Sequence, residues 1–294
     1  MSASFDANLA YALCYWVDSG GNLPSGWEVI WSPTGPAAGY TVVFQNSGQA
    51  TYAIVSQGTK DVWEALLECE VAHQDPLPYI TGNAKVARGN LDLLKITLDL
   101  KSSTGVRLGD VLPALAQAKN QILVTGHSLG AATATLMAPY VGFLINGGKP
   151  IAALPSNVTG MTFGTPAVGD SSFANFLNNN PSNYTSYNNT NDAVPCLWSM
   201  TGAFSIPNMY LLFAPPGPHP MPEGLKLPFQ NIVNNMKKNN VSYQQTKTVT
   251  FTFASIPETG KDPWLTELMY QHNTAYDIQF GIITNAAFTK GTTS

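Results

Sequence analysis

One segment near the middle of the chain constrains the fold more than any other. An apolar run of strand length at residues 122–125 leads into Gly126-His127-Ser128-Leu129-Gly130, and small or apolar residues that favour a helix fill residues 131–145. This order predicts a strand, a sharp turn centred on Ser128 and a helix, with glycines that let neighbouring backbone pass close to the turn. A strand followed directly by a helix is the building unit of a parallel α/β sheet.

The rest of the chain extends this pattern. A polar, glycine-containing connection at residues 46–49 joins two strand-like runs and predicts an antiparallel hairpin. Strands are expected at residues 27–31, 40–44, 51–56, 161–163, 184–187 and 246–254, and helices at residues 61–71 and 91–101. The predicted fold class is therefore α/β, with a mostly parallel central sheet, an antiparallel N-terminal hairpin and flanking helices in one domain over residues 1–294.

The surface should be polar but carry little charge. Charged residues make up 11% of the chain and the net charge is -4, whereas about 25% of the residues in an ordinary soluble domain are charged. No cationic field is available to hold phosphate backbones, so nucleic acid is not an expected partner. The longest uncharged helical stretch, residues 129–145, contains glycine and proline, and we expect a buried helix there and no membrane span.

Cysteines and the first residues bear on the compartment. Cys14, Cys69 and Cys196 lie far apart without a C-x-x-C pair, which predicts neither a zinc site nor a dense disulfide framework and allows one bridge at most. Residues 1–6 show neither a basic nor an apolar leader region. Either a leader was removed or the chain never had one.

The serine in the sharp turn needs a base if it is to react. A hydroxyl is a weak nucleophile unless a base accepts its proton, and the chain has four histidines. His127 adjoins Ser128 and should point away from it, while His73 precedes it, against the order serine, acid, histidine that is typical of such elbows. His219, in a proline-rich loop, and His272 remain. The alternative reading is a glycine-flanked serine in an ordinary strand-to-helix connection.

Three motifs together resemble a known family. They are Thr125-Gly126-His127-Ser128-Leu129-Gly130-Ala131, Thr162-Phe163-Gly164-Thr165-Pro166-Ala167-Val168-Gly169-Asp170 with Phe173, and Asn191-Asp192-Ala193-Val194-Pro195. With matching segments in the same order from about Ile54 to Tyr276, the chain resembles the fungal-type class 3 lipases. The resemblance implies an α/β-hydrolase fold and a serine carboxylic ester hydrolase that cleaves long-chain acyl esters, triacylglycerol above all, through an acyl-enzyme intermediate.

The resemblance also implies the partners. These are a lipid or ester substrate and transient contact with a lipid interface, and no cofactor is expected. The expected state is a monomer located outside the cell, with the cytoplasm as the alternative location. The same site could serve a feruloyl-type esterase or a phospholipase A1. From a different class, a catalytically silent binding module of the same fold is the alternative.

The family assigns a role to each candidate site residue. Its base lies in a late loop followed shortly by tyrosine, as His272 is followed by Tyr276, which favours His272 over His219. Asp192, 64 positions after Ser128, is the expected acid that orients the imidazole. Asp170 is its rival but resembles a family position at the start of a helix. The alternative for Asp192 is a turn residue before proline.

The expected oxyanion donors are two backbone N–H groups. Leu129 follows the nucleophile and supplies the first. Residues 54–59 end a strand in Gly-Thr and resemble the oxyanion strand of the family, so Thr59 supplies the second. The alternative is a plain strand terminus with a helix N-cap, and both interpretations can hold at once.

Four positions depart from the pattern of the family. Ala131 replaces the usual second glycine, Ala167 replaces an arginine, Gln57 replaces a common arginine, and Ala87-Arg88-Gly89-Asn90 stands where the family has H-x-G-F. These positions buttress the site without carrying its chemistry, so they bear on the subfamily more than on the reaction.

Directly after Thr59, residues 61–71 predict an amphipathic helix. Asp61 and Glu64 fit an N-cap and its capping partner, and one apolar stripe comprises Trp63, Leu66, Leu67 and Val71. Such a stripe usually faces the core. Because the lid of the family follows the oxyanion residue, a mobile lid is the other hypothesis.

Overall fold

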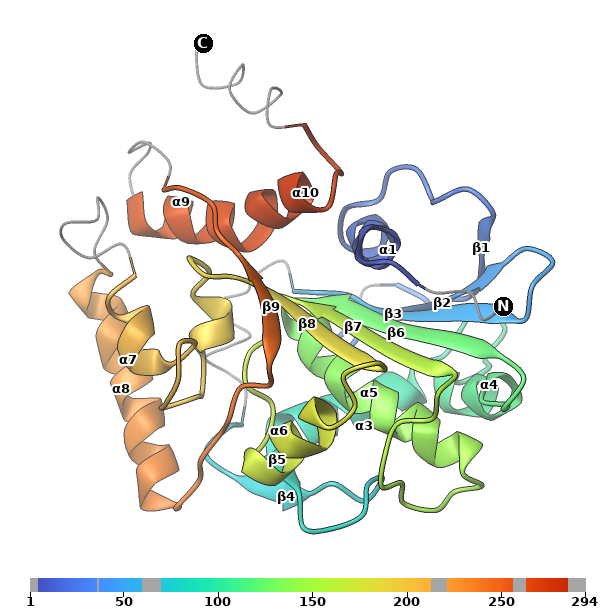
Figure 1. Ribbon diagram of the computed structural model, residues 1–294, viewed down its shortest axis with the longest axis horizontal. Coiled ribbons are helices and arrows are strands. Elements are labelled where there is room, and N and C mark those ends of the chain that lie inside the picture. Colours follow the sequence, from blue (N-terminus) through green and yellow to red (C-terminus); the bar gives the residue numbers. More distant parts are fainter. Residues whose placement is uncertain (1–4, 36, 60–69, 213–220, 256–262, 285–294) are drawn as a thin grey trace.

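A computed structural model describes residues 5–35, 37–59, 70–212, 221–255 and 263–284. Its centre is a sheet of seven strands in the order β1-β2-β3-β6-β7-β8-β9 (Figure 1). The first three strands pair antiparallel, and every pair from β3 to β9 is parallel. This is the predicted fold class: a mostly parallel sheet with an antiparallel N-terminal hairpin.

The strands of the main sheet are β1 (Trp27–Trp31), β2 (Thr41–Asn46), β3 (Thr51–Ser56), β6 (Gln121–His127), β7 (Val158–Phe163), β8 (Tyr184–Asn189) and β9 (Thr248–Phe251). A separate two-stranded ribbon consists of β4 (Gln74–Pro76) and β5 (Lys85–Ala87). The helices are α1 (Ala7–Ser19), α3 (Arg88–Asp99), α4 (Leu108–Leu115), α5 (Leu129–Ile145), α6 (Ser171–Asn178), α7 (Ile206–Met209), α8 (Glu223–Lys238), α9 (Pro263–Met269) and α10 (Ala275–Gln279). A 3₁₀ turn spans Val194–Cys196, and a π-helical turn, Tyr270–Thr274, joins α9 to α10.

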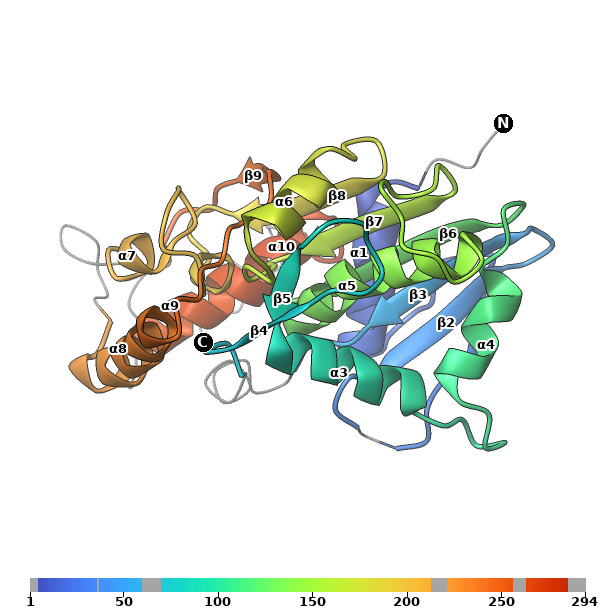
Figure 2. The same cartoon turned by 90° about the horizontal axis from the view of Figure 1, so that it is seen from below.

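Helices cover both faces of the sheet, as Figures 1 and 2 show. Successive side chains of a strand point to opposite faces, so the central strands feed two separate cores. One core lies under α1 and α10 and contains Val42, Phe44, Ala53, Val55, Leu123, Tyr276 and Phe280. The other lies against α3, α4 and α5 and contains Val43, Ile54, Ile122, Val124, Leu94, Leu112 and Met137.

A third apolar cluster is separate from these two cores. It joins the segment after β8 to α8 and α9, through residues such as Trp198, Phe229 and Trp264, each 1% exposed or less. Among the helices that the structure describes, none combines the length and apolar character needed to cross a bilayer.

Several elements differ from the sequence-based expectations. The helix expected at residues 91–101 begins at Arg88 and ends at Asp99, and the strand expected at residues 246–254 is only Thr248–Phe251. Of the helix expected at residues 61–71, residues 61–69 lie outside the described part, and Glu70 and Val71 are not helical. Helix α1 was not expected, although Asp6 caps it by accepting from the Leu9 N–H at 2.7 Å.

The described thiols are free. Cys14 and Cys196 are both buried and unbridged, while Cys69 lies outside the described residues. Burial raises the pKa of Cys196 to about 12, and it also raises that of Cys14. These two thiols are therefore small core residues in this structure.

Candidate active site

Ser128 sits on a sharp turn between β6 and α5. Its backbone has φ 60° and ψ -128°, a conformation that costs free energy in any residue other than glycine. The turn fits because its flanking glycines have no side chain: a Cβ on Gly126 would strike the backbone of Gly130, and one on Gly130 would lie 2.6 Å from the carbonyl carbon of Gln57. The predicted strand, turn and helix are confirmed.

The register of the parallel strands gathers the candidate residues at one edge. Ser56 at the end of β3 pairs with Gly126 in β6, which pairs with Thr162 in β7. The carboxyl ends of parallel strands meet at the same edge, where ligands of α/β sheets bind. Thr59, Ser128 and Asp192 all follow the carboxyl ends of their strands and come together there.

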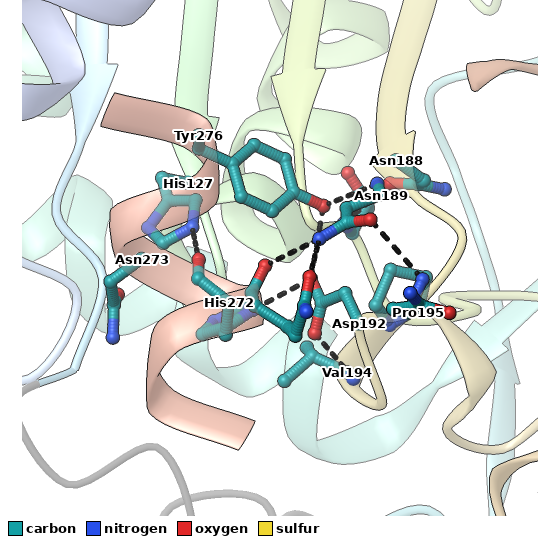
Figure 3. Close-up of polar contacts among 12 residues, drawn as sticks. His127, Asn188, Asn189, Asp192, Val194, Pro195, His272, Asn273 and Tyr276 are labelled. Carbon is teal, nitrogen blue, oxygen red and sulfur yellow. Dashed lines mark hydrogen bonds and ion pairs between the residues drawn. The ribbon is translucent and has the colours of Figure 1, made fainter. Parts of the chain in front are cut away.

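Asp192 and His272 form a fully buried pair. His272 Nδ1 lies 2.8 Å from Asp192 Oδ2, and both side chains are 0% exposed (Figure 3). The Tyr276 hydroxyl donates to the same oxygen at 2.9 Å, and the Val194 N–H donates to Asp192 Oδ1 at 2.9 Å. Because Nδ1–H donates to the carboxylate, Nε2 of the neutral ring is left as the acceptor.

Tyr276 keeps its proton in this arrangement. Burial, and next the negative charge of Asp192, raise its pKa well above the usual value. Its hydroxyl also accepts from the Asn189 N–H at 3.0 Å. The hydroxyl therefore ties the end of β8 to the carboxylate that follows it.

His272 lies in the π-helical turn, which corrects the expected late loop. The wider turn is fixed from β8: Asn189 Nδ2 donates to the carbonyl of Gln271 at 3.0 Å and to its side-chain Oε1 at 2.6 Å. Single π-helical turns inside longer helices occur often at functional sites. Here the turn holds the histidine on a rigid element in place of a loop.

His127, the neighbour of Ser128, stacks on His272. The two ring centroids lie 4.6 Å apart, and His127 Nε2 donates to the His272 carbonyl at 2.8 Å. Burial, followed by the electrostatic coupling to the neighbouring His272 imidazole, lowers the pKa of His127 well below the usual value, so the His127 ring is neutral. His127 therefore supports His272 from the nucleophile side.

A second link joins the serine to the histidine through Phe163 and Gly164. The Ser128 N–H donates to the Phe163 carbonyl at 3.0 Å. A Cβ on the next residue, Gly164, would lie 3.0 Å from His272 Cε1 and 3.2 Å from Asp192 Oδ2. Ser128 and the His272 ring thus contact neighbouring residues of the same segment.

Two polar atoms at this point lack partners. Ser128 Oγ and His272 Nε2 are buried, and neither has a hydrogen-bond partner among the described residues. Unpaired buried polar atoms are costly and rare in folded proteins. A donor hydroxyl and an acceptor nitrogen left open in this way are suited to reaction with a bound molecule.

A cavity of about 220 Å³ opens beside Ser128. It is lined by Asp18, Ser19, Gln57, Gly58, Thr59, His127, Ser128, Met269 and Asn273. Thr59, the expected second oxyanion donor, therefore lies at the same cavity as Ser128. Leu129 is the first residue of α5, and the backbone N–H groups of the first turn of a helix have no acceptor within that helix.

The rival candidates lie elsewhere. Asp170 caps α6, where it accepts from the Phe173 N–H at 2.9 Å, as its expected place at a helix start implies. His73 is half exposed beside Glu70. His219 lies outside the described residues. Asp18 lines the cavity, yet the sequence assigned it no role because no motif surrounds it.

Comparisons with known proteins agree with this geometry. The family model of class 3 lipases matches residues 53–201, half of the chain. The fold is similar to that of M37 lipase, at a TM-score of 0.75 and 19% identity over 95% of each chain. It is also similar to lipase II from Rhizopus niveus, at a TM-score of 0.50 and 22% identity over 67% of this chain and 72% of that one. A comparison with curated protein sequences gives no match.

The family match covers the elbow, the Gly164 segment and Asp192, which are the parts that the structure places around Ser128. The chain belongs to the class 3 lipase family and is a serine-type carboxylic ester hydrolase with the α/β-hydrolase fold.

Proposed function

We propose that this protein is a lipase that cleaves neutral long-chain acyl esters such as triacylglycerol, with Ser128 as nucleophile, His272 as general base and Asp192 as the acid that orients it. The observation that carries the proposal is the buried Asp192–His272 pair beside a strained Ser128, with Ser128 Oγ and His272 Nε2 both unpaired among the described residues. These are the parts that acyl transfer requires.

The chemistry follows from the hydrogen bonds. His272 Nε2 accepts the Ser128 proton as Oγ attacks the ester carbonyl, and Asp192 stabilises the imidazolium that forms. The imidazolium then protonates the departing alcohol oxygen. A water molecule, deprotonated by the same nitrogen, releases the acid from the acyl-enzyme.

The proposed oxyanion donors are the N–H groups of Leu129 and Thr59. Leu129 is the first residue of α5, directly after Ser128, and Thr59 lies in the loop after β3 and lines the cavity together with Ser128. Donors fixed in advance stabilise the developing oxyanion more than water can.

The charges around the cavity favour an uncharged substrate. Among the described residues that line it there is no lysine or arginine, and the two ionisable ones are Asp18 and the neutral His127. Leu265 and Met269, one turn apart on α9, are 39% and 37% exposed, and Met269 reaches the cavity. An anionic phospholipid head group would meet no cation among these lining residues, whereas a triacylglycerol needs none.

The test is hydrolysis of chromogenic esters of increasing acyl length, emulsified triacylglycerol, a phospholipid and a feruloyl ester. Wild-type protein should be most active on long-chain neutral esters, and Ser128→Ala should remove that activity. A preference for phospholipid or feruloyl ester would replace the proposed substrate. Absence of hydrolysis of every ester would support the catalytically silent binding module.

The one-domain organisation over residues 1–294, the monomeric state and the extracellular location stay predictions of the sequence. Light scattering of the purified chain measures the second of these directly.

A further inference from the structure

The C-terminal end of α1 is bonded to the loop that carries Thr59. Gln57 Nε2 donates to the Val17 carbonyl at 2.8 Å, and the Gly58 N–H donates to Asp18 Oδ1 at 2.8 Å. Two successive residues of the loop are thus held by two successive residues of the helix, 40 positions away in sequence. Both bonds lie immediately before Thr59.

The same loop presses on the nucleophile elbow from its other side. A Cβ on Gly58 would lie 3.1 Å from the His127 carbonyl oxygen and 3.4 Å from Ser128 Cβ. Gly58 therefore lies close to both α1 and the elbow. The backbone N–H of Gln57 is held by the Tyr40 carbonyl at 2.8 Å, and the next N–H, that of Gly58, is held by Asp18 of α1.

Within the described part of the chain, Asp18 has no cationic partner. Its Oδ2 lies 3.8 Å from His127 Nδ1, but His127 uses its Nε2–H for the His272 carbonyl, so Nδ1 of this neutral ring carries no proton. The other groups that interact electrostatically with Asp18 are Tyr11 and Cys14 on α1 and Asp277 on α10, none of them cationic. Burial, countered by the Gly58 N–H and supported by Asp277, raises the pKa of Asp18 to about 7.

In its protonated form, the carboxyl group suits both neighbours. Its carbonyl oxygen can accept from Gly58 while its hydroxyl faces the bare Nδ1 of His127. An asparagine would offer the same pair, an acceptor oxygen and a donor nitrogen, in nearly the same shape. The acceptor oxygen is therefore the feature of Asp18 that the loop needs, and the negative charge is dispensable.

We propose that Asp18 is a positioning residue of the oxyanion loop, whose side-chain oxygen holds the Gly58 N–H and so fixes Thr59 against Ser128. The proposal rests on the proposed function for its catalytic consequence. Removing the acceptor should lower the rate of acyl transfer and leave the binding of the ester nearly unchanged, because the donor that moves acts on the oxyanion of the transition state.

The experiment compares four variants of the full chain on a soluble short-chain ester, with kcat and KM measured separately. Asp18→Ala and Asp18→Leu both remove the acceptor, and Asp18→Leu keeps most of the volume. Both should lower kcat roughly tenfold to hundredfold, the range for losing one strong hydrogen bond or one oxyanion donor, with KM within about twofold. Asp18→Asn should keep kcat within about threefold of wild type. Asp92→Ala, at an exposed carboxylate paired with Lys95, is the control and should match wild type.

A second measurement does not depend on catalysis. Hydrogen exchange at the Gly58 amide should be faster in Asp18→Ala and Asp18→Leu than in wild type and Asp18→Asn, because the bond to Oδ1 protects that amide. This measurement tests whether Asp18 holds the loop even if the wild-type protein hydrolyses no ester. Absence of hydrolysis would overturn only the proposed function.

Three outcomes would overturn the role of Asp18. The first is wild-type kcat in Asp18→Leu, and the second is a loss in Asp18→Asn as large as in Asp18→Ala, which would mean that charge is what matters. The third is unchanged exchange at Gly58 in all variants. A loss in Asp18→Ala that Asp18→Leu restores would instead assign the residue to packing.

Discussion

Substituting Gly164 tests whether this position limits the placement of the His272 ring. The structure offers Gly147 as a matched control, so the effect of backbone strain can be distinguished from displacement of the imidazole. Gly164 has φ 59°, and an added Cβ would lie 3.0 Å from His272 Cε1 and 3.3 Å from His272 Nδ1. Gly147, just after α5, has a similar φ of 68° and open space where its Cβ would be. Substituting alanine at either position imposes the cost of a left-handed conformation, about 1 kcal/mol.

Only the change at Gly164 also pushes on the imidazole. A contact of 3.0 Å must lengthen by a few tenths of an ångström, and His127 stacked at 4.6 Å on the ring resists that shift. A misplacement of about 1 Å in an active site can cost about a hundredfold in rate, so we expect a loss of roughly tenfold in kcat for Gly164→Ala. Gly147→Ala should keep the wild-type kcat.

The assays are thermal unfolding and steady-state hydrolysis of a soluble ester. Gly147→Ala should lower Tm by about 2–4 °C, the shift expected for about 1 kcal/mol in a chain of this size. Gly164→Ala should lower Tm at least as much and should alone lose activity. Equal kcat for the two variants would refute the argument that the Gly164 segment limits the position of His272.

Three further predictions concern the remaining features of the site. Ser128→Ala and His272→Ala should each lower kcat by about four orders of magnitude or more with circular dichroism unchanged, because a triad acts as a unit; His219→Ala should do little, and the opposite pattern would move the base to residue 219. Because the pKa of Asp18 is raised from 3.8 to about 7, the folded state binds the extra proton between these values, so the free energy of unfolding should fall as pH rises from about 4 to 7. Urea titrations should show a flatter dependence in Asp18→Asn, and an equal slope would contradict the assignment. If residues 61–71 form a lid, Trp63→Glu should lose more activity on emulsified than on soluble ester, and equal losses would leave that segment as core.

The sequence predicted the parts of the site whose structure is encoded locally. The elbow depends on Gly126 and Gly130, each two residues from Ser128. At both positions, an added Cβ would overlap neighbouring backbone atoms. Asp192 follows a strand with turn residues and could also be located. Short motifs are enough to locate both features, even though the space at Gly130 is limited by Gln57 of a distant segment.

The parts that failed depend on packing between distant segments. The π-helical turn at His272 is held by Asn189, 82 residues from Gln271, and no local pattern distinguishes it from a loop. Asp18 binds the Gly58 N–H, 40 residues away in sequence. An aspartate near the end of a helix is common, so its residue type and position did not predict this contact. Helix α1 does have a local sequence signal, because Asp6 is a typical N-cap residue before an apolar run. The predicted elements did not include it.

The order in which the site is assembled follows from one feature of the fold. Helices α1 and α10 share one apolar core on the same face of the sheet, although one comes first along the chain and the other last. During synthesis, β3, β6, β7 and β8 can emerge and pair before the segment with His272 exists, and chains emerge at roughly 5–20 residues per second. The proposed nucleophile therefore emerges before its proposed base. With these assignments, hydrolysis should begin only when α9 and α10 dock, so the onset of activity during synthesis should mark completion of the site.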